Sequence, residues 1–181
     1  MRGLVRVGAA VPSLALGNVK ENMKRHLAMM REAKEKHVSI VTFPELSLTG
    51  YTCGDLFFQR RLLDDVTDAL LALKDEMPEG ILAVVGAPLE IEGALYNCAV
   101  VLHKGEIISA VPKTFLPNNG EFYEKRWFQS DDARRDASVA IPKLKTDVCR
   151  QAIFETSDGV RFGIELCEDL WAPLPPSTML S

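Results

Sequence analysis

The 181-residue sequence lacks the features that identify several large classes of protein. It has no run approaching the roughly 20 apolar residues that a membrane-spanning helix requires. Lysine and arginine (21) are fewer than aspartate and glutamate (25), which gives a net charge of −4, and aromatic residues make up only 7% of the chain. Because nucleic-acid binding needs a basic surface and profits from stacking aromatics, we expect neither a nucleic acid nor a membrane as partner.

Paired cysteines and nucleotide-binding loops are missing as well. The four cysteines, Cys53, Cys98, Cys149 and Cys167, form no C-x-x-C pair, so neither a zinc site nor a small disulfide scaffold is expected. This predicts no metal and a reduced, cytoplasmic protein. The sequence contains no Walker loop, no dinucleotide fingerprint and no Ser-Gly-Gly pyrophosphate loop, so we expect no cofactor bound by this chain.

The pattern that is present predicts one α/β domain over residues 1–181. The chain is 47% hydrophobic, enough for a core of one compact domain. Residues 4–11 alternate like a first strand; the other interpretation, a short secretory signal, is disfavoured because Pro12 interrupts the apolar stretch. Asn18, with Glu21 three residues on, is typical of a helix start.

Two amphipathic helices and several strands follow in the sequence. Apolar residues at helical spacing define the helices: Val19, Met23, Leu27 and Met30 in the first, and Leu62, Val66, Leu70 and Leu73 in the second, which Pro78 and Gly80 end. Strands are predicted at 38–43 and 81–86, a hairpin at 96–111 with its turn at 103–106, and a second hairpin at 148–166. We interpret 44–60 as a polar connection, 112–137 as a long loop with a helical turn or two, and the segment from Pro173 as irregular because of its prolines. Helices that alternate with strands, followed by hairpins, indicate layers of helices on mixed sheets.

Three ionisable side chains stand just beyond apolar strands. Glu45 follows strand 38–43, Lys113 follows 107–111, and Cys167 follows 160–166. If these strands run the same way, a carboxylate, an ammonium and a thiol meet at one rim, where layered α/β folds commonly bind ligands.

These three groups suit acyl transfer through a thioester. A thiol is about 3% ionised at pH 7, so a nearby carboxylate that takes its proton and an ammonium that favours the thiolate would activate it. The ammonium could also stabilise the oxyanion formed at an attacked carbonyl. Each residue also has an ordinary interpretation: Cys167 as a small apolar residue, Glu45 as a helix cap and Lys113 as a solvated turn residue.

Three segments resemble the signature motifs of the nitrilase superfamily of carbon–nitrogen hydrolases. They are residues 43–51 (FPELSLTGY), 112–117 (PKTFLP) and 165–171 (ELCEDLW), in the family's order along the chain. The resemblance implies a four-layer α-β-β-α sandwich with Glu45 as general base, Lys113 as oxyanion holder and Cys167 as nucleophile.

Further positions acquire roles from the same resemblance. Glu124 matches a second glutamate that buttresses the lysine, with an exposed loop charge as the alternative. The backbone N–H of Glu168 would be a second oxyanion donor. Glu168, Trp171 and Tyr51 would line the substrate pocket, although Trp171 and Tyr51 could equally be packing aromatics.

Finer features resemble one branch of the superfamily, the amidohydrolase domain of glutamine-dependent NAD synthetases. They include residues 52–57 (TCGDLF), 95–99 (LYNCA) and 121–128 (EFYEKRWF). This branch implies L-glutamine as substrate, a homo-oligomer, and a C-terminal synthetase domain, outside this chain, that uses ATP and Mg²⁺ to convert deamido-NAD to NAD with the released ammonia.

The chain ends fourteen residues after Cys167. Since the family continues with further strands and helices, we expect a sandwich that is incomplete at the C-terminus. Two alternatives stay open: a free-standing amidase, nitrilase or carbamoylase, and an inactive truncated interaction module whose exposed sheet recruits a partner.

Overall fold

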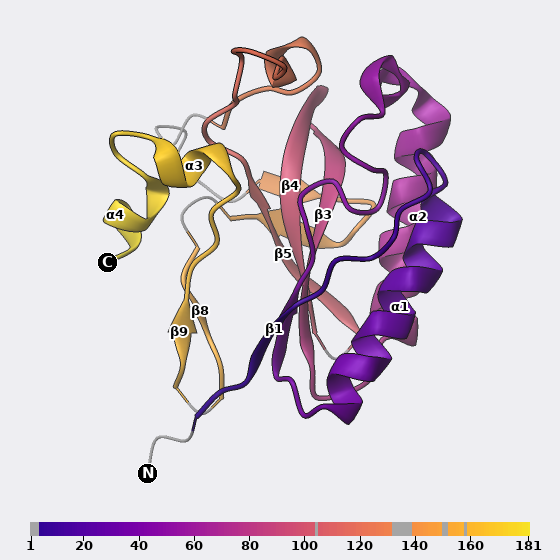
Figure 1. Ribbon diagram of the computed structural model, residues 1–181, viewed down its shortest axis with the longest axis vertical. Coiled ribbons are helices and arrows are strands. Elements are labelled where there is room, and N and C mark those ends of the chain that lie inside the picture. The colour runs from indigo at the N-terminus through magenta and orange to yellow at the C-terminus, as the bar shows by residue number, and fades with distance from the viewer. Residues whose placement is uncertain (1–3, 104, 132–138, 150–151, 158) are drawn as a thin grey trace.

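A mixed seven-stranded sheet organises the computed structural model, which describes residues 4–103, 105–131, 139–149, 152–157 and 159–181 (Figure 1). The strand order is β1-β2-β3-β4-β5-β7-β6, and β8 and β9 form a separate two-stranded sheet. The strands are β1 (Val7–Ala9), β2 (Ile40–Thr42), β3 (Leu82–Ile91), β4 (Ala94–His103), β5 (Glu106–Pro112), β6 (Val139–Ile141), β7 (Thr146–Val148), β8 (Phe154–Glu155) and β9 (Arg161–Phe162). The helices are α1 (Val19–Glu35), α2 (Arg60–Glu76), α3 (Glu168–Trp171) and α4 (Pro176–Leu180), with 3-10 turns η1 (Gly54–Phe58) and η2 (Glu124–Arg126).

Helices α1 and α2 cover one face of the large sheet (Figure 1). Both predicted apolar stripes are confirmed, since most of their members are buried: Val19, Leu27 and Met30 of α1, and Leu62, Val66, Leu70 and Leu73 of α2. Asn18 caps α1, and its Oδ1 accepts the backbone N–H of Glu21 at 3.2 Å. The principal core therefore lies between this helical layer and the sheet.

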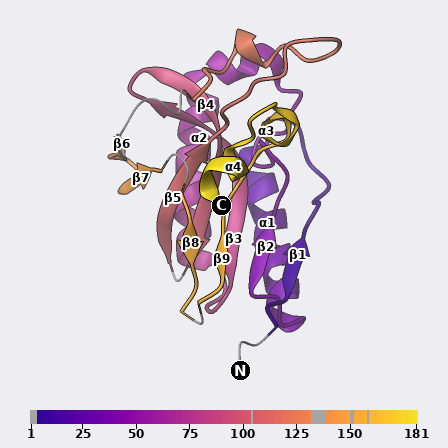
Figure 2. The same ribbon diagram turned by 90° about the vertical axis from the view of Figure 1, so that its left-hand side faces the viewer.

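The opposite face of the sheet carries the β8–β9 hairpin, as the turned view in Figure 2 shows. A second apolar cluster fills this interface, with Leu82, Val84 and Val101 from the sheet and Phe154 and Phe162 from the hairpin. The described residues thus stack as α, β, β layers, which confirms the α/β class. None of the helices in the described part of the chain is long and apolar enough to cross a bilayer.

The directions of the strands decide which chain segments meet. Strand β2 pairs parallel to β3, and β3 and β5 both pair antiparallel to β4. Strands β2 and β5 therefore run the same way, and their carboxyl ends lie at one rim of the sheet. This confirms the expected meeting of the segments that carry Glu45 and Lys113.

Several predicted boundaries were wrong. Strand β3 continues to Ile91 and turns into β4 through Glu92 and Gly93, whose φ values of 50° and 81° suit a tight two-residue hairpin. Val148 pairs with β5 and β6 in the large sheet rather than with the later hairpin. The predicted connection 44–60 contains η1.

The segment after Pro173 is also more regular than expected. It contains helix α4, which starts at Pro176. Proline is tolerated at the first helical position because its missing N–H has no partner there in any case. Parts of two other predicted segments, residues 132–138 of the long loop and residues 150–151 and 158 of the second hairpin, lie outside the described residues.

Candidate active site

Glu45 lies in a tight turn directly after β2. The turn folds over β3, where the backbone N–H of Leu48 donates to the Gly86 carbonyl at 3.1 Å. A Cβ placed on Gly86 would lie 2.3 Å from the Pro44 carbonyl oxygen and 2.6 Å from the Cα of Glu45. The turn can therefore approach the strand only because residue 86 is glycine.

Lys113, just past β5, is fully buried between two carboxylates. Its Nζ lies 2.9 Å from Oε2 of Glu45 and 2.8 Å from Oε1 of Glu124. Burial lowers the pKa of Lys113, but the hydrogen bonds and charges of Glu124 and Glu45 outweigh this and raise the pKa above its usual value. The side chain is thus held as an ammonium, which can donate to an oxyanion.

Two further side chains donate hydrogen bonds to these carboxylates. Tyr51 donates its hydroxyl to Oε1 of Glu124 at 2.6 Å, and Asn97 donates its Nδ2–H to Oε2 of Glu45 at 3.1 Å. Burial, followed by Glu124, raises the pKa of Tyr51, so it stays a donor. Because Lys113 and Asn97 both engage Oε2 of Glu45, its Oε1 is the oxygen available to take a proton.

Cys167 stands at a sharp turn between β9 and α3. Its φ of 46° and ψ of −98° are unusual for a residue with a side chain, and this conformation presents the thiol at the surface. A cavity of about 170 Å³ is lined by both Cys167 and Glu45, together with Phe43, Gly86 and other residues. The thiol and the carboxylate therefore face the same space.

The thiol is protonated in the resting site. Burial raises the pKa of Cys167, the charge of Glu45 raises it further, and Lys113 lowers it, with Glu124 and Glu168 adding smaller increases. Lys113 thus favours the thiolate, as expected, but burial and the charge of Glu45 outweigh its effect on the pKa of Cys167. The arrangement instead suits a base that removes the proton as the sulfur attacks.

The remaining predicted residues divide into two groups. Glu124 contacts Lys113, and Tyr51 contacts Glu124. The alternative of an exposed loop charge for Glu124 is wrong, since it is 1% exposed. Trp171 is 74% exposed, so its alternative as a core aromatic is also wrong. Neither Trp171 nor Glu168 lines the cavity shared by Glu45 and Cys167.

A buried polar cluster from α1 supports the turn that carries Glu45, and the sequence patterns did not reveal it. The fully buried His26 ring contacts the Asn22 carbonyl through Nδ1 at 2.7 Å and the Ser47 Oγ through Nε2 at 2.8 Å. A carbonyl only accepts, so Nδ1 carries the proton and Nε2 accepts from Ser47. Asn22 also donates to the Leu48 carbonyl at 3.0 Å.

Burial of His26 predicts an acid-sensitive fold. Burial lowers the pKa of His26 to about 4, partly opposed by its bond to Asn22. As the pH drops, His26 is therefore protonated in the unfolded chain before it is protonated in the folded chain. The free energy of unfolding falls between pH 6.5 and about 4, by about 3 kcal/mol in all. Urea denaturation across this range should show the loss, and His26→Gln should show a shallower slope. The exposed His37 provides the matched control, since His37→Gln should keep the wild-type slope. Equal slopes in wild type and His26→Gln would contradict the assignment.

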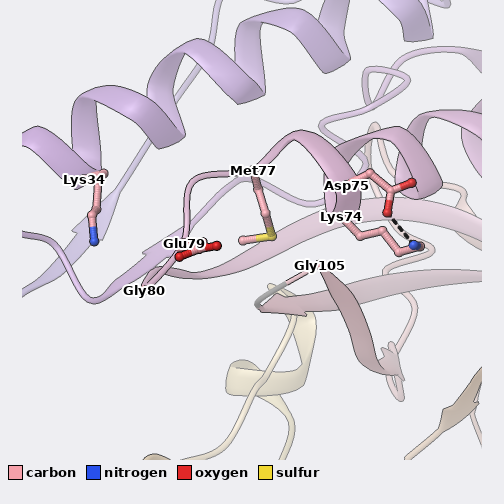
Figure 3. Close-up of a pocket in the computed structure, with 7 residues that line it drawn as sticks. All are labelled: Lys34, Lys74, Asp75, Met77, Glu79, Gly80 and Gly105. Carbon is pink, nitrogen blue, oxygen red and sulfur yellow. Dashed lines mark hydrogen bonds and ion pairs between the residues drawn. The ribbon is translucent and has the colours of Figure 1, made fainter.

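Two buried cysteines and a larger cavity elsewhere in the molecule show no comparable arrangement of a thiol, a carboxylate and an ammonium. Burial raises the pKa of both Cys53 and Cys98, which keeps them as thiols. A cavity of about 600 Å³ at the opposite end of the sheet is lined by Lys34, Glu79 and neighbouring residues (Figure 3). Its Lys74 is paired with Asp75 at 2.6 Å.

Within the described residues, no cluster of His, Cys, Asp and Glu could hold a metal ion.

Comparison with known proteins places this geometry in context. The chain matches the carbon–nitrogen hydrolase family over residues 6–180. The glutamine-dependent NAD(+) synthetase of Mycobacterium tuberculosis (strain ATCC 25618 / H37Rv) is 38% identical over 178 residues, which cover 97% of this chain and 26% of that protein. The Arabidopsis thaliana protein of the same name is 34% identical, covering 90% and 23% respectively. The chain thus spans about a quarter of the length of the curated relatives it matches.

Solved structures agree with this relationship. A glutamine-dependent NAD(+) synthetase from Cytophaga hutchinsonii superposes with a TM-score of 0.82 at 29% identity, over 91% of this chain and 28% of that one. An amidase from Nesterenkonia sp., at 16% identity and a TM-score of 0.70 over 93% of this chain and 57% of that one, shares the nitrilase-like fold. The chain therefore belongs to the carbon–nitrogen hydrolase family, within which it matches the amidohydrolase portion of the glutamine-dependent NAD synthetases.

Proposed function

We propose that this chain hydrolyses the side-chain amide of L-glutamine through a thioester on Cys167. The observation that carries the proposal is the Lys113 ammonium held between Glu45 and Glu124, with the Cys167 thiol facing the cavity that Glu45 lines. Related proteins named glutamine-dependent NAD(+) synthetase support glutamine as the substrate.

Each reacting group has a defined task. Glu45 takes the proton of the Cys167 thiol while the sulfur attacks the carboxamide carbon. The Lys113 ammonium and the backbone N–H of Glu168 donate to the oxyanion of the tetrahedral intermediate. Glu45 then passes its proton to the departing nitrogen, and ammonia leaves.

The second half of the cycle uses the same groups. Water attacks the γ-glutamyl thioester while Glu45 takes a proton from it. Collapse of the second tetrahedral intermediate releases glutamate and restores the thiol. Glu124 and Tyr51 orient the ammonium, and Asn97 orients the Glu45 carboxylate. Glu168 and Trp171 lie on α3 outside the cavity that Glu45 and Cys167 share, so they would contact only a part of the substrate that extends beyond this cavity.

In the whole protein, the ammonia would serve a C-terminal synthetase domain. That domain would use ATP and Mg²⁺ to amidate deamido-NAD to NAD, and this chain would form the glutaminase portion of a cytoplasmic homo-oligomer. The names of the curated relatives, of which the chain covers about a quarter, support the link to NAD synthesis. The roles of ATP, Mg²⁺ and deamido-NAD, the homo-oligomer and the cytoplasmic location rest on the resemblance of the sequence motifs.

A substrate panel tests the proposal. Release of ammonia is measured for glutamine, asparagine, an aliphatic amide, a nitrile and an N-carbamoyl amino acid. We expect glutamine to be preferred by about 100-fold or more in kcat/KM, because a site built to bond polar groups discriminates strongly against substrates that lack them. Preference for a simple amide, nitrile or carbamoyl substrate would instead identify a free-standing hydrolase. No turnover of any of them would indicate an interaction module.

Gly86→Ala is expected to lower turnover because the new methyl group displaces the turn that carries Glu45. A shift of about 1 Å in a reacting group can cost about 100-fold in rate, and overpacking costs about 1–3 kcal/mol of stability. Ammonia release and urea denaturation measure the two effects.

Gly93→Ala is the matched control for this variant. Gly93 has a φ of 81° in the β3–β4 turn, and a Cβ there would meet nothing within 4 Å. The change should reduce stability by about 1 kcal/mol and leave turnover unchanged. Unimpaired turnover in Gly86→Ala would contradict the proposed constraint on Glu45.

A further inference from the structure

Asp169 is a buried carboxylate that contacts two separate segments of the candidate site. Its side chain is on α3, two residues after Cys167, and the residue is 2% exposed. Oδ1 accepts the backbone N–H groups of Thr114 at 3.0 Å and Phe115 at 2.7 Å. Oδ2 accepts the backbone N–H of Leu166 at 3.1 Å.

These three amides flank the reacting groups. Thr114 and Phe115 directly follow Lys113, and Leu166 directly precedes Cys167, so one carboxylate joins the two segments across more than fifty residues of sequence. The loop after β5 and helix α3 lie at the same end of the sheet in both views (Figures 1 and 2).

The same residue also holds the turn at Cys167 in its unusual conformation. The backbone N–H of Asp169 donates to the Leu166 carbonyl at 3.0 Å, while the Leu166 N–H donates to the Asp169 side chain. The two bonds close the turn from both sides of Cys167. A residue with a φ of 46° costs about 1–3 kcal/mol, and it persists only where its surroundings fix it.

A carboxylate suits this position better than any neutral side chain. Burial raises the pKa of Asp169, and the bonds from Phe115, Leu166 and Thr114 oppose that rise. An ionised carboxylate offers acceptors only, which matches three N–H donors. An asparagine would turn its NH₂ group toward a backbone N–H in either orientation, leaving buried donors unsatisfied.

We propose that Asp169 is a positioning residue that fixes the Cys167 thiol relative to the Lys113 ammonium. The inference rests on the proposed function, which assigns these two groups to the reaction. Asp169 acts through its hydrogen bonds to the backbone of both segments. The pKa of Cys167 is shifted by the charges of other residues, namely Glu45, Lys113, Glu124 and Glu168.

A double-mutant cycle on thiol reactivity tests this role. The rate of Cys167 alkylation by iodoacetamide is measured against pH, with peptide mass spectrometry, for wild type, Asp169→Asn, Lys113→Met and the double variant. We expect Asp169→Asn to slow alkylation of Cys167 at pH 7 by about 10-fold and to shift the midpoint of the rate-against-pH curve upward. The reason is that the Lys113 ammonium is no longer held at a fixed distance from the Cys167 thiol. In the Lys113→Met background the same substitution should change the rate by less than about 2-fold, since coupled residues are not additive.

Two controls separate positioning from a general loss of stability. Ser109→Ala removes a buried hydroxyl that bonds the Asp147 carbonyl within the same sheet, away from both segments, and should leave Cys167 alkylation unchanged. Amide hydrogen exchange of the folded Asp169→Asn protein should accelerate at Thr114, Phe115 or Leu166 before other sites.

The outcomes distinguish this inference from the proposed function. Equal slowing in both Lys113 backgrounds, or no slowing in either, overturns the role of Asp169 even if glutamine is hydrolysed. Coupling between Asp169 and Lys113 in a protein that does not hydrolyse glutamine supports the positioning role and overturns the proposed function.

Discussion

Cys167→Ala is expected to reduce glutamine hydrolysis by about 10⁴-fold or more. Removing the nucleophile of a site whose members act as a unit costs nearly the whole chemical acceleration. Ammonia release at saturating glutamine measures the effect. Cys149→Ala is the matched control, because Cys149 is a free, partly buried thiol that does not line the cavity of Glu45 and Cys167, and turnover should be unchanged.

The backbone conformation of Cys167 is expected to lower the free energy of unfolding of any variant with a Cβ at this position. Cys167 adopts a φ of 46°, which glycine tolerates and residues with a Cβ rarely adopt. Cys167→Gly should therefore be inactive yet about 1 kcal/mol more stable than Cys167→Ala in urea denaturation. Substantial turnover in either variant would show that another group performs the chemistry.

Lys113→Met is expected to lower kcat by about 100-fold or more and to destabilise the fold as well. The substitution removes an oxyanion donor and leaves Glu124, 1% exposed, without its ammonium. Losing one partner of a buried ion pair costs about 3–5 kcal/mol. Ammonia release and urea denaturation measure the two effects separately.

The double variant Lys113→Met/Glu124→Gln separates catalysis from stability. Neutralising Glu124 removes the unpaired buried charge, so most of the lost stability should return while turnover stays low. Turnover that recovers with stability would mean that Lys113 is a structural residue only, and unchanged turnover in Lys113→Met would remove its proposed role altogether.

Local periodicity was sufficient to predict the helical layer. The stripes that begin at Val19 and Leu62 repeat over several turns, and both helices bury them against the sheet. The β3–β4 hairpin was missed because both strands are buried on both faces and show no alternation, and because the Glu92–Gly93 turn lacks asparagine or aspartate. Strands β6 and β7 have only three residues each, too few for a periodic signal.

The reacting residues were easier to identify than those that position them. Glu45, Lys113 and Cys167 stand out because each ionisable group follows an apolar strand. Asn97, within an apolar stretch of β4, carried a readable signal, since a buried amide in a strand needs a partner.

His26 and Asp169 carried no such signal. Besides their near neighbours, they bond Ser47 and Thr114, which lie 21 and 55 positions away in sequence, so only the folded chain reveals these distant contacts. The exposure of Trp171 was equally unpredictable, because an aromatic residue after the turn fits a core as well as a surface.

Labelling by a glutamine analogue with a diazo-ketone in place of the carboxamide tests the central claim most directly. The account predicts a single covalent adduct on Cys167, mapped by peptide mass spectrometry, that excess glutamine prevents and Lys113→Met slows. Adducts spread over all four cysteines, or an unlabelled Cys167, would contradict it.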